Sequence, residues 1–147
     1  MHTDKIFVDT WAWLALANKK DSYHEIAKAC YEKIKMLGYK LVTSDYVLDE
    51  TITILFRNVA FIKALMFVDA IFSMIKMKKI RLEKVNAQRF EAAWVLRKKY
   101  QDKPDISFTD FTSFVIMQEK GIRKVFTGNS HFRALNLGFE IFPEELK

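Results

Sequence analysis

Acidic and amide side chains occur in this sequence where alternating strands and helices would gather them into a metal site. Asp9 ends a short apolar run at residues 6–8, which is typical of a strand buried on both faces. Asp105 and Asp110 flank the start of a helix that Thr109 is predicted to cap, and Asn129 follows another apolar run by two residues. Oxygen donors of this kind suit Mg²⁺ or Mn²⁺, which proteins hold with a few carboxylates, water and substrate phosphate.

Helix phase distinguishes Glu50 from its neighbour Asp49. At about 100° per residue, Glu50 falls about 60° from Val47, at the margin of the apolar stripe of a helix predicted at residues 46–56. A carboxylate at the edge of a buried face must be paired or bind a cation. We therefore expect Glu50 to join the metal site and Asp49 to be solvated.

Each acid also has a purely structural explanation. An Asp after a strand often caps the next helix, and for Asp9 this alternative has about equal weight. Asp105, beside Pro104, is suited to a turn, and Asp110 in the first turn of a helix is favourable for the helix dipole alone. The three histidines and Cys30 show no ligand spacing, so we do not expect a zinc site.

Apolar runs and helical periodicity alternate along the chain, and this pattern predicts the elements that position the acids. Strands are expected at residues 6–8, 41–43, 80–85, 125–127 and 139–142, with helices between most of them. Because such alternation indicates crossover connections, we predict that residues 1–147 form one domain, a three-layer α/β/α sandwich with a mostly parallel sheet of about five strands. Sites in these sheets form beyond the carboxyl ends of the strands, where Asp9 and Asn129 fall.

The charge balance favours a polyanionic partner. A net charge of +6 and a pI of about 9.4 suit either nucleic acid or an acidic protein segment. We predict that one short basic run contacts RNA phosphates, namely Lys76, Lys78, Lys79 and Arg81. A solvated face with no partner is an equal alternative for a run this short.

Composition excludes several other classes of protein. Half of the residues are hydrophobic, which is too many for a disordered chain. Charged residues interrupt the apolar stretches before they reach the length of a membrane span, and no signal peptide is expected. Since Cys30 is the only cysteine, an intramolecular disulfide is impossible and a cytoplasmic location is expected.

Four segments of the chain resemble the motifs of the PIN-domain nucleases, especially the VapC-type toxins of toxin–antitoxin pairs. The first segment is IFVDT at 6–10 followed by DSYHEIA at 21–27, the second is TSDYVLDET at 43–51, the third is DISFTD at 105–110 and the fourth is TGNSHF at 127–132. Each motif is short, but their order and spacing cover almost the whole chain. The resemblance implies a three-layer α/β fold and metal-dependent cleavage of RNA.

The resemblance also implies roles for individual residues. Asp9, Glu50 and Asp110 match the invariant acids of the family, and Asp105 matches an acid of many toxin members. Asp9 and Asp110 would hold the better Mg²⁺ or Mn²⁺ ion, with Asp105 and Asn129 completing a weaker second position.

Two threonine hydroxyls are expected to support the acids, and two positions depart from the family pattern. Thr10 and Thr127 would orient the carboxylates. Asn129 stands where the family often has Asp, and Trp11 replaces a small polar residue. For Trp11 and Trp13, packing in the core or at an interface is favoured over RNA stacking.

The expected function is therefore that of a ribonuclease toxin, with RNA as substrate and an antitoxin protein as inhibitor. A non-catalytic member of the same fold, binding RNA or a protein, is the alternative that Asn129 keeps open. An acid-cluster phosphatase or a deoxyribonuclease is a third class. The apolar stretch at residues 60–74 is expected to form a homodimer or antitoxin surface, or else a helix buried all round.

Overall fold

The computed structural model describes residues 4–144, and its centre is a sheet of five parallel strands in the order β3-β2-β1-β4-β5. The predicted strands are all present, with bounds that differ by one or two residues: β1 Lys5–Val8, β2 Lys40–Ser44, β3 Ile80–Glu83, β4 Lys124–Phe126 and β5 Glu140–Phe142. The strand order reverses between β1 and β4, because the chain adds β2 and β3 on one side and β4 and β5 on the other. Ligand sites in open α/β sheets form at this kind of reversal.

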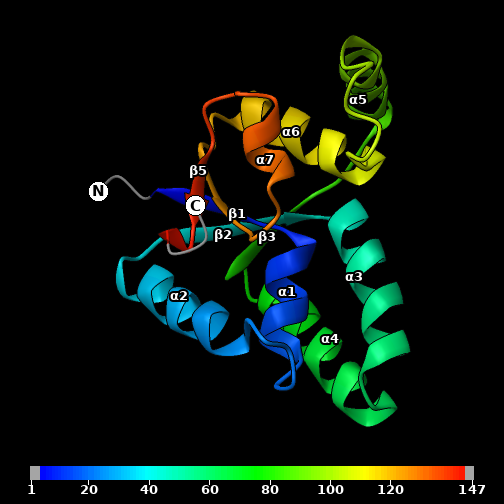
Figure 1. Cartoon of the computed structure of the whole chain (residues 1–147). Helices are drawn as coiled ribbons and strands as arrows, with labels where there is room; N and C mark the ends of the chain where they lie inside the picture. Colours follow the sequence, from blue (N-terminus) through cyan, green and yellow to red (C-terminus); the bar gives the residue numbers. More distant parts are fainter. Residues whose placement is uncertain (1–3, 145–147) are drawn as a thin grey trace.

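Seven helices in the described range cover both faces of the sheet, which confirms the predicted three-layer sandwich (Figure 1). Their bounds are α1 Thr10–Ala17, α2 His24–Met36, α3 Asp45–Asn58, α4 Phe61–Lys76, α5 Ala87–Lys99, α6 Phe108–Lys120 and α7 His131–Ala134. Figure 1 shows α1 to α4 on one side of the sheet and α6 and α7 on the other, with α5 packed against α6.

The middle of the sheet and α6 form the centre of the core. Residues 6–8 of β1 are almost completely buried, as expected for a parallel strand covered on both faces. Phe111 and Phe114 of α6 are fully buried, and Phe114 also meets Phe132 of α7 edge-on with ring centroids 5.0 Å apart. This packing fixes the first turn of α6, which carries Asp110, against the carboxyl end of the sheet.

Side-chain caps define where α3, α5 and α6 begin. Ser44 accepts the backbone N–H of Val47 at the start of α3, and Ser107 accepts that of Asp110 at the start of α6. Thr109, the expected cap of α6, lies instead inside its first turn, where its carbonyl accepts hydrogen bonds from the next turn. Its prediction as the cap is wrong by two residues, since Ser107 also precedes the apolar run.

The apolar face of α4 is exposed in the single chain, so the prediction of a helix buried all round is wrong. Only Ala64, Val68 and Ile71 of this helix are buried. Large side chains on its other faces meet solvent, namely Phe61, Ile62, Leu65, Met66 and Phe72. None of the helices in residues 4–144 combines the length and apolar content needed to cross a membrane.

Candidate active site

Asp9 lies at the carboxyl end of β1, in the place predicted from the sequence. Its backbone N–H donates to Phe126 at 3.1 Å, so β1 and β4 stay aligned one residue beyond the strand. This alignment brings the hydroxyl of Thr127 within 2.8 Å of Asp9 Oδ2, to which it donates. Asp9 occupies the N-cap position of α1, but its side chain makes no capping hydrogen bond, so capping does not explain the residue.

Asp110 comes to the same edge of the sheet from the first turn of α6. The residue is buried, with 4% of its surface exposed. Its Oδ2 lies 2.9 Å from Nδ1 of His131 and 3.3 Å from Nδ2 of Asn129. Since an ionised carboxylate only accepts hydrogen bonds, this contact requires the His131 tautomer protonated on Nδ1.

The loop that follows β4 links the two acids. The backbone N–H of Asn129 donates to the Thr127 hydroxyl at 2.9 Å, and that of His131 donates to Asn129 Oδ1 at 2.9 Å. The amide oxygen of Asn129, which was expected as a metal ligand, is therefore engaged by backbone, and the amide nitrogen faces Asp110. In this arrangement Asn129 supports Asp110 as a hydrogen-bond donor.

Glu50 completes the acidic group at longer range. It lies half-buried on α3 while Asp49 is exposed, as helix phase predicted. Burial, the charge of Asp110 and, to a smaller extent, that of Glu50 together raise the pKa of Asp9 to about 7, against the hydrogen bond from Thr127. The three carboxylates thus lie close enough for their charges to disfavour ionisation of Asp9.

The donor set fits a hard divalent cation bound by few protein ligands. A buried carboxylate facing a second one is relieved either by a proton or by a cation. The buried Thr10 hydroxyl has no hydrogen-bond partner among the described residues, which adds an unused oxygen next to Asp9. Within residues 4–144 no three or more His, Cys, Asp or Glu side chains come together as a group that could hold a metal ion by themselves. Mg²⁺ commonly needs only one or two carboxylates, with water and phosphate filling its shell.

Two sets of predicted site residues lie apart from this group. Asp105 is exposed in the turn between α5 and α6, and no contact found in residues 4–144 joins it to Asp9 or Asp110. The basic run is exposed too, but Lys76, Lys78 and Lys79 precede β3 and lie at the amino edge of the parallel sheet, opposite the acids. Arg81 pairs with Glu83. A position beside the acidic site would favour the predicted contact with RNA phosphates, and the basic run does not lie there.

Sequence reasoning missed two features of the site. His131 contacts Asp110 across 21 positions of sequence, and no ligand spacing marks it. Gly128 touches Trp11, because a Cβ built on Gly128 would lie 2.3 Å from the indole. Trp11 is thus packed against the site loop and contacts Tyr23, with ring centroids 5.5 Å apart. Trp13 is core, as expected, and donates to the hydroxyl of Thr43.

The family follows from a match to the PIN domain, whose model covers residues 6–137 of this chain. The chain belongs to the PIN domain family. That range includes the whole acidic site and its loop, from the end of β1 to the loop after β4. The resemblance predicted from four short motifs is thereby confirmed.

This PIN domain is similar to a toxin of known specificity. It is 35% identical over 140 residues to the 23S rRNA-specific endonuclease VapC20 of Mycobacterium tuberculosis, in two strains, covering 95% of this chain and 99% of the relative. The crystal structure of VapC20, described as a Sarcin-Ricin loop cleaving toxin, superposes with a TM-score of 0.76 at 33% identity over 92% of this chain and 97% of that one.

A second solved structure shares the fold of this PIN domain. It is the DNA-bound VapBC of Salmonella typhimurium, with a TM-score of 0.68 at 16% identity, covering 95% of this chain and 97% of the matched one. At this low sequence identity, the likeness shows a shared overall fold alone.

Proposed function

We propose that this chain is a Mg²⁺- or Mn²⁺-dependent endoribonuclease that acts as the toxin of a type II toxin–antitoxin pair. The observation that carries the proposal is the buried Asp9, held by Thr127 beside Asp110 at the reversal of strand order, with its pKa raised to about 7. Near full-length similarity to a 23S rRNA-specific endonuclease supports RNA as the substrate class. We take residues 1–147 as one nuclease domain, and its cytoplasmic location stays a prediction.

Asp9 and Asp110 are the residues that would hold the ion, with Glu50 binding directly or through water. When bound, a divalent ion activates the attacking water and neutralises charge on the phosphate. The remaining side chains position these acids. Thr127 fixes Asp9 through its hydroxyl, while His131 and Asn129 hold Oδ2 of Asp110, and within residues 4–144 no hydrogen bond reaches its Oδ1.

Asp105 and Asn129 remain proposed for a weaker second position. Asp105 lies in an exposed turn, so it would have to approach the acids when RNA binds. The amide of Asn129 would have to rotate to offer its oxygen, because Oδ1 now accepts the His131 N–H. Thr10, whose hydroxyl has no partner among the described residues, is proposed to orient Asp9 or bound water.

We infer two protein partners. The exposed apolar face of α4 is larger than isolated surface residues explain, so we propose that a second copy of the chain or an antitoxin covers it. The acidic site suits an arginine from an antitoxin tail, because guanidinium matches carboxylate geometry. A monomeric mass in light scattering would count against the homodimer.

A non-catalytic RNA-binding module is the second candidate. The observation that favours it is that Asp110 already has two hydrogen-bond partners, because His131 and Asn129 both contact its Oδ2. These donors satisfy the carboxylate without a cation. Such a protein would bind RNA without cutting it.

Cleavage assays separate the two candidates. Purified protein is incubated with 23S ribosomal RNA, with single-stranded DNA and with a phosphate monoester, each in Mg²⁺, in Mn²⁺ and in excess chelator. The proposal expects cleavage of RNA alone, dependent on metal and abolished in Asp9→Asn and Asp110→Asn. Asp49→Asn, which changes an exposed acid beside Glu50, is the matched control and should cut normally. Cleavage in chelator, or by either Asn variant, would falsify the proposed site.

A further inference from the structure

We propose that a groove along α5 binds an unpaired base of the RNA substrate next to the acidic site, with Trp94 and Phe90 as its stacking surface. This inference rests on the proposed function, since it names a feature of the substrate that the same site would act on.

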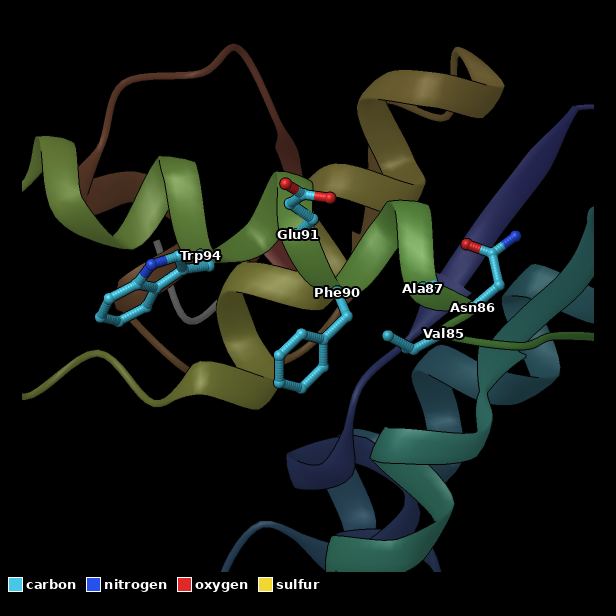
Figure 2. Close-up of a pocket in the computed structure, with 6 residues that line it drawn as sticks. All are labelled: Val85, Asn86, Ala87, Phe90, Glu91 and Trp94. Atoms are coloured by element: carbon cyan, nitrogen blue, oxygen red, sulfur yellow. The ribbon is translucent and has the colours of Figure 1, made fainter.

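The groove is open and largely apolar. It has a volume of about 520 Å³ and is lined by Val85, Asn86, Ala87, Phe90, Glu91 and Trp94. Phe90 and Trp94 keep 48% and 51% of their surfaces exposed, although aromatic rings of this size are normally covered. Figure 2 shows both rings on the same side of α5 as Val85, with the carboxylate of Glu91 pointing away from them.

The groove is attached to both helices that carry the acids. Phe90 packs on Phe108, the first residue of α6, with ring centroids 5.0 Å apart, and Asp110 follows two residues later. At the other end, the Val85 N–H donates to Asp45 Oδ1 at 2.9 Å, and Asp45 is the first residue of α3, which carries Glu50. A nucleotide in the groove would therefore lie close to a phosphate held at the acids.

The stacking surface is rigid before any ligand binds. Asn86 caps α5 by accepting the N–H of Arg89 at 2.9 Å. The buried guanidinium of Arg89 then donates to Glu83 of β3 at 2.9 Å and to Glu119 of α6 at 3.1 Å. Because α5 is fixed to both β3 and α6, its side chains and backbone lose little conformational entropy when a base stacks on it.

Charge complementarity selects nucleic acid as the occupant. The ammonium of Lys98 lies 5.9 Å from the centre of the Trp94 ring, and Lys84, which directly precedes the lining residue Val85, is exposed. Glu91 is the only acid in the lining, and its carboxylate points away from the rings in Figure 2. Flat aromatic rings flanked by lysines match a base with its phosphates, and stacking of this kind tolerates any base.

The test measures binding of a fluorescein-labelled single-stranded RNA to the Asp110→Asn protein, in which cleavage is prevented. We expect Trp94→Ala to weaken binding by about tenfold, and Trp94→Phe, which keeps an aromatic face, to retain most of it. Val95→Ala is the matched control, because Val95 is equally exposed on the same helix and does not line the groove. Thermal melts confirm that the variants remain folded.

An abasic RNA of the same length identifies what the groove recognises. It keeps the phosphates but lacks bases, so Trp94→Ala and its parent should bind it equally. Equal binding of normal RNA by parent and Trp94→Ala, an equal loss on abasic RNA, or no RNA binding by the parent would each overturn the inference. If Trp94→Ala binds RNA weakly while the wild type cuts none in any metal, the groove stands and the nuclease proposal fails.

Discussion

The hydroxyl of Thr127 donates to Oδ2 of Asp9 at 2.8 Å, although 118 positions separate the two residues in the sequence. The contact exists because β1 and β4 are neighbouring parallel strands whose carboxyl ends meet at one edge. Thr127 is fully buried, so the hydroxyl has no competing water. Asp9 is held in one orientation before a cation binds.

Removing this hydroxyl should impair the metal site more than the fold. We expect Thr127→Val, which keeps the shape of the side chain, to lower the cleavage rate and the apparent affinity for Mn²⁺ by about 10- to 100-fold. Thr127→Ser retains the donor and should stay within a few-fold of the wild type. The measurement is the initial cleavage rate over a series of Mn²⁺ concentrations, and equal curves for the Val variant and the wild type would contradict the assigned role.

Neutralising Asp9 should remove activity without loss of stability. Because burial and the Asp110 charge raise the pKa of Asp9 to about 7, Asp9 is ionised at pH 8 and its buried charge then lowers the stability of the folded chain. In chelator at pH 8, Asp9→Asn should therefore melt at or above the wild-type temperature. Adding Mn²⁺ should raise the melting temperature of the wild type and not that of the variant. A wild-type melt unmoved by millimolar Mg²⁺ or Mn²⁺ contradicts the metal site.

Because of the ion pairs of Arg89, the free energy of unfolding should fall steeply as the pH becomes acidic. Burial favours protonation of Glu83, but hydrogen bonds from Arg81 and Arg89 outweigh it and lower its pKa; the hydrogen bond from Arg89 likewise lowers the pKa of Glu119. Stability from both groups is complete above the ordinary glutamate pKa of 4.5 and is lost as pH falls through the lowered values.

Breaking this buried pair therefore has a pH-dependent cost. Arg89→Met should destabilise the fold by about 3–5 kcal/mol at pH 7, since it leaves Glu83 buried with weaker compensation. The difference from wild type should shrink below pH 4.5, where Glu83 becomes protonated in the variant. Urea titrations at several pH values measure both effects, and a difference independent of pH is the contrary result.

Gly128 should tolerate no side chain while Trp11 is present. A Cβ at Gly128 would lie 2.3 Å from the indole, so Gly128→Ala must displace Trp11 or the loop that carries Asn129. We expect lower stability and at least tenfold slower cleavage, which would be partly recovered in Trp11→Ala/Gly128→Ala. Melting and cleavage of the two single variants and the double variant form the cycle. Additive losses would exclude the steric explanation.

Local sequence patterns predicted the elements and the acids at their ends. Asp9 was predictable because a wholly apolar run must be a central strand, and Glu50 because helix phase fixes its face. His131 was not, since its contact with Asp110 depends on the path of the loop after β4. The distance of the basic run from the acids was also not predictable from charge alone, because it depends on which edge of the sheet carries the run. Residues that precede a parallel strand lie at its amino end.

The loop after β4 carries three linked residues at alternate positions, Thr127, Asn129 and His131. The backbone N–H of Asn129 donates to the Thr127 side chain, and that of His131 donates to the Asn129 side chain. Their side chains also reach Asp9 and Asp110. A change at the middle position, Asn129, thus loosens its neighbours on both sides and both carboxylates together. We expect the loop to tolerate simultaneous replacement of all three residues by a compatible set far better than replacement of any one of them. Scans of single substitutions would therefore underestimate how many sequences this loop can accept.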